Sequence, residues 1–64
     1  MYIKFQTEND QRFAQLFVVH VGKSLAVLPQ QPDGSFVARV DKGTVADLEK
    51  ARQHGLDVEE YYEE

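Results

Sequence analysis

The sequence predicts an α+β domain in which an antiparallel meander of three to four strands is followed by one C-terminal helix. Short β-branched and aromatic runs separated by turn residues fill 1–40, a pattern typical of a meander. One helical pattern with a clear stop signal follows over 44–54. The chain has 64 residues and no cysteine, so its single small core is predicted to form without a disulfide or a thiolate metal site.

The first strand is predicted over 2–7. Ile3 and Phe5 alternate there with Lys4 and Gln6, which places the apolar side chains on one face and the polar ones on the other. A polar segment then interrupts the pattern before the next apolar run.

The next apolar segment carries two conflicting signals. Residues 17–21 are β-branched and aromatic, which favours a strand. By contrast, Phe13, Leu16 and Phe17 stand at helical spacing, and Asn9 or Asp10 before them can cap a helix. We predict a strand over 12–21, with a helical turn over 10–16 as the alternative.

Two further strands complete the predicted sheet. Residues 22–23, a glycine and a lysine, are predicted to form a tight hairpin turn because glycine adopts the positive φ that such turns require. The chain returns as a strand over 24–28, and Pro29 ends it because proline cannot donate to the ladder. The turn sequence at 32–34 then leads into a strand over 36–40.

The C-terminal helix has the clearest boundaries. Thr44 is predicted to cap its start, and an apolar stripe follows at Val45, Leu48 and Ala51. Gly55 is predicted to end the helix in the left-handed conformation, with Leu56 folding back onto the stripe.

A hairpin that turns at 22–23 would place apolar side chains on both faces of the sheet. Antiparallel sheets normally have one polar face, and a single helix covers only one face. We predict that a second copy of the chain covers the other face, with the N-terminal helical turn or a different protein as alternatives. The predicted homodimer interface consists of Leu16, Val18, His20, Leu25 and Val27.

The acidity of the chain is concentrated at its C-terminal end. The net charge is −4, yet residues 1–56 are nearly neutral, while 57–64 hold five acids and no base. We therefore predict one domain over 1–56 and an acidic tail, or a short helical turn, over 57–64. Carboxylates with aromatic rings between them suit a basic groove on a protein partner. The predicted partner-binding residues are Asp57, Glu59, Glu60, Tyr61, Tyr62, Glu63 and Glu64.

Direct nucleic-acid binding is disfavoured because the basic residues are scattered. The seven Lys and Arg residues do not form the basic cluster that nucleic-acid-binding proteins carry. Such a surface would require four bases to line up on one sheet face, namely Arg12, Lys23, Arg39 and Lys42.

Catalytic and metal chemistry have little support in the residue pattern. His20 and His54 are the two histidines, and no serine or threonine has a histidine at a suggestive spacing. A zinc site needs at least three converging ligands. We predict no enzymatic activity, no cofactor and no metal site.

A membrane-spanning segment is also excluded by the pattern, because the longest apolar run, 16–19, is far shorter than a span of about 18 residues. Residues 1–4 lack the basic-then-apolar layout of a signal peptide. We expect a cytoplasmic protein.

These observations predict a small non-enzymatic protein–protein interaction module, regulatory or inhibitory, that self-associates through the second apolar sheet face. In size, charge and shape the chain is similar to small phage-encoded proteins that bind host enzymes or defence complexes, without sharing a motif with them. The acidic C-terminal segment, rather than that resemblance, supports the alternative function: an inhibitor of this phage-encoded type whose C-terminal carboxylates block the nucleic-acid-binding groove of a target enzyme.

Overall fold

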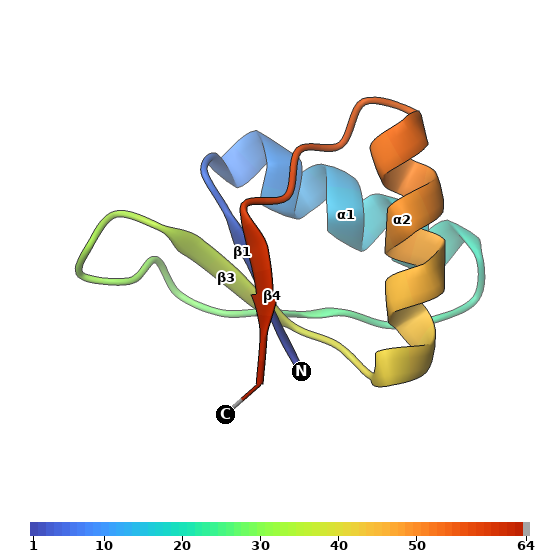
Figure 1. Cartoon of the computed structure of the whole chain (residues 1–64), viewed down its shortest axis with the longest axis horizontal. Helices are drawn as coiled ribbons and strands as arrows, with labels where there is room; N and C mark the ends of the chain where they lie inside the picture. The colour runs from blue at the N-terminus through green and yellow to red at the C-terminus, as the bar shows by residue number, and fades with distance from the viewer. Residues whose placement is uncertain (64) are drawn as a thin grey trace.

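The computed structural model describes residues 1–63, which form four strands and two α-helices in one sheet-and-helix unit (Figure 1). In chain order the elements are β1 (Tyr2–Phe5), α1 (Glu8–His20), β2 (Ala26–Val27), β3 (Phe36–Arg39), the 3-10 turn η1 (Lys42–Thr44), α2 (Val45–Gln53) and β4 (Glu60–Tyr62). The predicted α+β class and antiparallel sheet are confirmed.

The order of the strands is β2-β3-β1-β4, with every neighbouring pair antiparallel. The predicted meander is therefore wrong, because β1 lies between β3 and β4. Each helix connects two strands that flank a third: α1 leads from β1 to β2 across β3, and α2 leads from β3 to β4 across β1. This β-α-β-β-α-β order is the split β-α-β arrangement of ferredoxin-like folds.

Helix α1 replaces the strand predicted over 12–21. Its N-cap is Thr7, whose Oγ1 accepts a hydrogen bond from the Asp10 backbone N–H at 3.2 Å and donates one to the Asp10 carboxylate at 2.7 Å. Ala14 and Val18 are buried at helical spacing against the sheet. The alternative helical turn was right in kind but too short, since this tertiary packing outweighs the local β propensity of the β-branched residues.

Gly22 ends α1 and does not turn a hairpin. It has φ 82°, and its N–H donates to the Val19 carbonyl at 3.0 Å while the Lys23 N–H donates to Val18 at 3.0 Å. This bonding pattern is a Schellman motif. A glycine with positive φ suits a hairpin turn and a helix end equally well, so the residue itself did not distinguish the two structures.

Helix α2 agrees with its prediction except at its first turn. Gly55 has φ 106°, and the Leu56 N–H bonds to the Ala51 carbonyl at 3.1 Å, so Leu56 folds back as predicted. Thr44 does stand at the predicted N-cap position, but it also ends η1, and its side chain makes no capping hydrogen bond.

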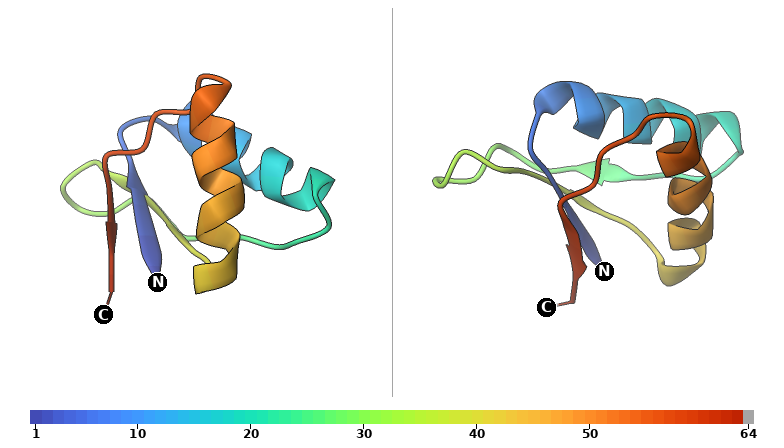
Figure 2. Two further views of the ribbon diagram at one scale, coloured as in Figure 1. Left: turned by 45° about the vertical axis from the view of Figure 1, so that its right-hand side comes forward. Right: turned by 45° about the horizontal axis from the view of Figure 1, so that its top comes forward.

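Both helices lie on one side of the sheet (Figure 2). One apolar core lies between the helices and that face of the sheet. It is built from β1, β3 and both helices, and its fully buried members include Ile3, Phe5, Ala14, Val18, Ala38, Leu48 and Ala51. The opposite face, called here the open sheet face, carries the side chains of alternate register positions. They are Tyr2, Lys4, Val37, Arg39, Glu60 and Tyr62.

The C-terminal segment, for which a helical turn was one prediction, instead contains strand β4. Glu60 pairs with Lys4, and Tyr62 pairs with Tyr2, so this segment forms one edge of the sheet. Tyr61 lies opposite Ile3 and packs against the core, which anchors the strand. Glu64 lies outside the described residues.

Candidate functional site

The outward side of α1 carries a line of residues at heptad spacing, called here the α1 stripe: Asn9, Phe13, Leu16 and His20. These positions lie opposite the buried Gln11, Ala14 and Val18, because residues that are about half a turn apart face opposite ways. Leu16 is 71% exposed and Phe13 is 37% exposed. The centre of the outward side is therefore apolar.

A shallow hollow of about 470 Å³ runs along the α1 stripe. Phe17, half-buried against the core, forms one wall of the hollow. Arg12 forms another, and its guanidinium is paired with the Glu8 carboxylate at 3.1 Å. Because this ion pair holds the Arg12 guanidinium at the edge of the hollow, the floor of the hollow is apolar.

The outward side of α2 has the usual polar character. Among its exposed residues are Glu49 and Arg52, which form an ion pair at 3.3 Å. A helix on the surface of a small domain normally turns its polar side to water, as α2 does. Helix α1 buries Ala14 and Val18 on its inward side, and it also exposes apolar side chains to solvent, namely Phe13, Leu16 and Val19. Among the described elements, α1 is therefore the candidate binding surface.

The structure separates the residues of the predicted dimer interface. Val18 and Leu25 lie in the core of the protein itself and are not on its surface. Leu16 and His20 lie on the α1 stripe, and Val27 is an exposed residue of β2. The predicted second apolar sheet face does not exist, because Glu8–His20 is a helix that crosses the sheet instead of a strand within it.

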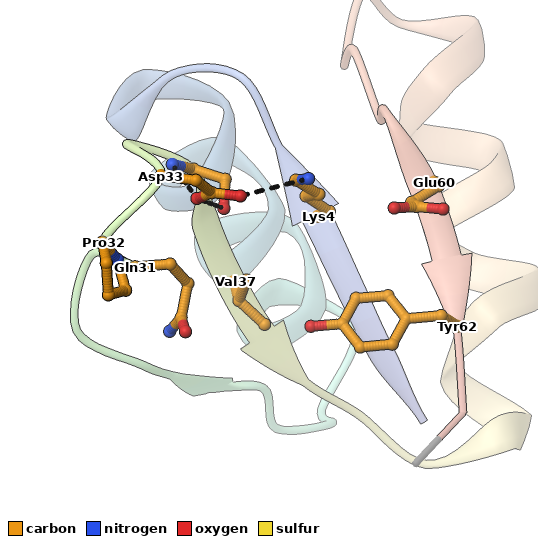
Figure 3. Close-up of a pocket in the computed structure, with 8 residues that line it drawn as sticks. Lys4, Gln31, Pro32, Asp33, Val37, Glu60 and Tyr62 are labelled. Carbon is orange, nitrogen blue, oxygen red and sulfur yellow. Dashed lines mark hydrogen bonds and ion pairs between the residues drawn. The ribbon is translucent and has the colours of Figure 1, made fainter.

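A second concave region lies on the open sheet face (Figure 3). It is a groove of about 370 Å³ between the loop 29–35 and β4. Lys4 lies at its centre, and its Nζ is 3.5 Å from the Asp33 carboxylate. Tyr62 extends across β1 towards Val37 and stacks on Tyr2 with ring centroids 5.4 Å apart.

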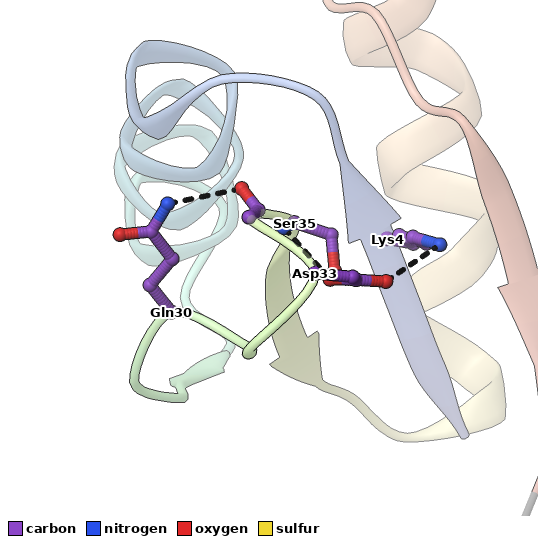
Figure 4. A network of polar contacts seen from close by, with 5 residues as sticks. Lys4, Gln30, Asp33 and Ser35 are labelled. Atoms are coloured by element: carbon purple, nitrogen blue, oxygen red, sulfur yellow. Dashed lines mark hydrogen bonds and ion pairs between the residues drawn. The ribbon is translucent and has the colours of Figure 1, made fainter.

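Hydrogen bonds hold the loop beside this groove (Figure 4). The backbone N–H and hydroxyl of Ser35 both donate to Asp33 Oδ1, at 2.9 and 2.6 Å, and Gln30 Nε2 donates to the Gly34 carbonyl at 3.0 Å. The bonds from Ser35 lower the pKa of Asp33 below its ordinary value, with a smaller contribution from Lys4. Asp33, followed by Glu59, raises the pKa of Lys4.

The predicted partner-binding residues of the acidic tail are dispersed over different surfaces. Glu60 and Tyr62 line the groove on the open sheet face, whereas Tyr61 points into the core side. Burial, and then the nearby Glu49 carboxylate, raise the pKa of Tyr61 to about 12. The other three described acids lie at different places: Glu63 pairs with Lys42 at 3.0 Å, Glu59 lies near Lys4, and Asp57 is exposed.

The four bases considered for nucleic-acid binding do not share a sheet face. Three of them are engaged in ion pairs on other elements: Arg12 with Glu8, Lys23 with Asp47 at 2.6 Å, and Lys42 with Glu63. Arg39 alone of the four lies on the open sheet face. The arrangement that a nucleic-acid surface required is therefore absent from residues 1–63.

Within the described part of the chain, no three His, Asp or Glu side chains lie close enough together to hold a metal ion. Neither of the helices described is both long and apolar enough to cross a membrane.

Comparison with known proteins adds no relative: no family model matches the chain, and neither curated proteins nor solved structures contain a match. A ferredoxin-like strand order is shared by proteins of many functions, so it does not assign one. The α1 stripe and the groove on the open sheet face are the two candidate binding surfaces.

Proposed function

We propose that the protein is a small non-enzymatic interaction module that binds a helix of a protein partner through the α1 stripe. The observation that carries the proposal is the 71% exposure of Leu16 at the centre of an apolar helix face. Exposed apolar patches rimmed by polar groups are typical of protein–protein contact sites. The rim here is polar, with the Arg12–Glu8 ion pair on one flank.

The spacing of the stripe indicates the shape of the partner. Positions 9, 13, 16 and 20 recur every three or four residues, which is the spacing of a seam that packs against a second helix. An amphipathic helix laid along α1 would place its own apolar side chains in the hollow beside Phe13 and Leu16. The proposed partner surface is therefore an apolar helix stripe.

A comparison of three baits tests this function. The wild-type chain, Leu16→Glu and Ala46→Glu would be immobilised and exposed to a lysate of the cells that make the protein. Ala46 is exposed on α2, so its substitution adds the same charge to the polar helix. We expect a protein that is retained by the wild type and by Ala46→Glu and lost from Leu16→Glu. Identical proteins on all three baits would refute the proposed surface.

A second candidate function is favoured by the groove on the open sheet face. Glu60 and Tyr62 of the acidic segment line it, and the Lys4 ammonium at its centre is paired with the Asp33 carboxylate of the 29–35 loop, which leaves Glu60 as the carboxylate offered to a partner. We propose, as the alternative, that these groups bind a basic segment of a target protein and so block its access to nucleic acid. An arginine-rich peptide should then bind more weakly to Glu60→Gln than to Glu8→Gln, whose carboxylate lies on α1, and more weakly at high salt. Equal binding by both variants would contradict this alternative.

A further inference from the structure

The α1 stripe has an internal symmetry that points to a specific partner. We infer that the helix bound by α1 is α1 of a second copy of this chain, packed antiparallel about a two-fold axis. This inference rests on the proposed function, because it uses the same surface and names its occupant.

The stripe reads polar, apolar, apolar, polar: Asn9, Phe13, Leu16 and His20. In an antiparallel pair centred between positions 14 and 15, Phe13 lies opposite Leu16 of the second copy, and Asn9 lies opposite His20 of the second copy. Two-fold symmetry repeats both contacts, as a self-complementary interface requires. Each apolar residue therefore meets an apolar residue, and each polar residue meets a polar one.

The end contacts are chemically suited to each other. The Asn9 side-chain amide both donates and accepts hydrogen bonds, and the His20 imidazole carries a donor and an acceptor. Asn9 lies in the first turn of α1 and His20 is its last residue, so antiparallel packing brings the positive end of one helix dipole to the negative end of the other. A parallel pair would instead align the dipoles and place two imidazoles side by side.

The contact is small, which is typical of weak and transient interfaces. A helix of 13 residues is about 20 Å long, so the pair buries less than the roughly 800 Å² per partner of a standard interface. We expect the chain to dimerise as the protein concentration rises through a range on the order of 10 µM to 1 mM. Sedimentation equilibrium over this range should show wild type and Ala46→Glu passing from one chain to two, while Leu16→Glu stays at one.

The absence of cysteine from the sequence makes the direction of the helices measurable. Asn9→Cys and His20→Cys would be prepared separately, mixed in equal amounts and oxidised mildly. In the antiparallel pair, positions 9 and 20 lie side by side, whereas two copies of position 9 are about 16 Å apart along the axis, beyond disulfide reach. The mixed disulfide between positions 9 and 20 should make up more than half of the disulfide-linked product. As a control, Asn9→Cys mixed with Ala46→Cys should form no mixed disulfide.

The outcomes separate the inference from the function on which it rests. A wild-type chain that stays monomeric at 1 mM, yet captures another protein through Leu16, overturns the second copy as partner and leaves the function standing. A dimer that survives Leu16→Glu overturns α1 as its interface. A Leu16-dependent dimer that yields the two symmetric disulfides instead of the mixed one overturns the antiparallel arrangement alone. A monomer without Leu16-dependent capture overturns both.

Discussion

Leu16 and Val18 lie two residues apart on α1 and face opposite sides of the protein. Val18 is fully buried in the core, whereas Leu16 is 71% exposed. In a strand, residues two apart share a face, but in a helix they are separated by about 200°. Substitutions at the two positions are therefore a matched pair: a change at Val18 tests the packing of the core, and a change at Leu16 tests the binding surface.

Val18→Ala should lower the free energy of unfolding by about 2 kcal/mol, because it removes methyl groups from a packed interior and leaves a cavity. Leu16→Ala should change it by less than about 0.5 kcal/mol at low concentration, where the chain is monomeric. Urea unfolding followed by circular dichroism compares the two. A larger loss for Leu16→Ala than for Val18→Ala would show that the sides of α1 are assigned wrongly.

Thr7→Ala should destabilise the protein by about 1 kcal/mol, because the Asp10 backbone N–H loses its acceptor at the start of α1. Thr7→Ser keeps the hydroxyl and should retain most of the stability. Both variants would be compared by thermal unfolding. If Thr7→Ser is as unstable as Thr7→Ala, the hydroxyl does not cap the helix.

Gln11 joins α1 to the sheet from a buried position. Its Nε2 donates to the carbonyl oxygens of Leu28 at 3.3 Å and Val37 at 2.9 Å. Gln11→Met keeps the length of the side chain but removes the donor, so it should cost about 1–3 kcal/mol of unfolding free energy. Gln15→Met, half-buried on the same helix, is the control and should be nearly neutral. Equal urea midpoints for the two variants would show that the hydrogen bonds of Gln11 do not stabilise the fold.

Tyr61 should make the fold sensitive to alkali. Its pKa is about 12 in the folded protein and 10.0 ordinarily, so the folded state holds the phenolic proton more tightly than the unfolded chain. Its contribution to stability is complete below pH 10 and declines as the pH rises from about 10 to about 12. Tyr61→Phe should remove this part of the decline, whereas Tyr62→Phe on the open sheet face should keep it. Unfolding midpoints measured at pH 9 to 12 test this expectation. Identical profiles for both variants would contradict the assignment of the alkaline loss of stability to Tyr61.

Part of the site could be found in the sequence and part could not. Phe13 and Leu16 of the stripe were recognised at helical spacing, whereas His20 was assigned to a strand. Thr7 followed by Asp10 three positions later is a capping signal that was missed. The open sheet face, by contrast, joins residues from both ends of the chain, such as Lys4 and Glu60, beside Asp33 of a central loop. No local pattern encodes such a pairing.

Local sequence patterns predict the α+β class, strands over 2–7 and 36–40, and the end of α2 at Gly55 with Leu56. The structure has these strands at Tyr2–Phe5 and Phe36–Arg39 and confirms the helix end. These features depend on alternation and on backbone preferences that act over a few residues. Long-range packing, in contrast, makes residues 8–20 a helix and pairs β1 with both β3 and β4. Apolar β-branched residues fit a helix or a strand locally, so they do not select one of the two. The burial of Ala14 and Val18 against a sheet built from distant segments selects the helix and thereby turns Leu16 outward.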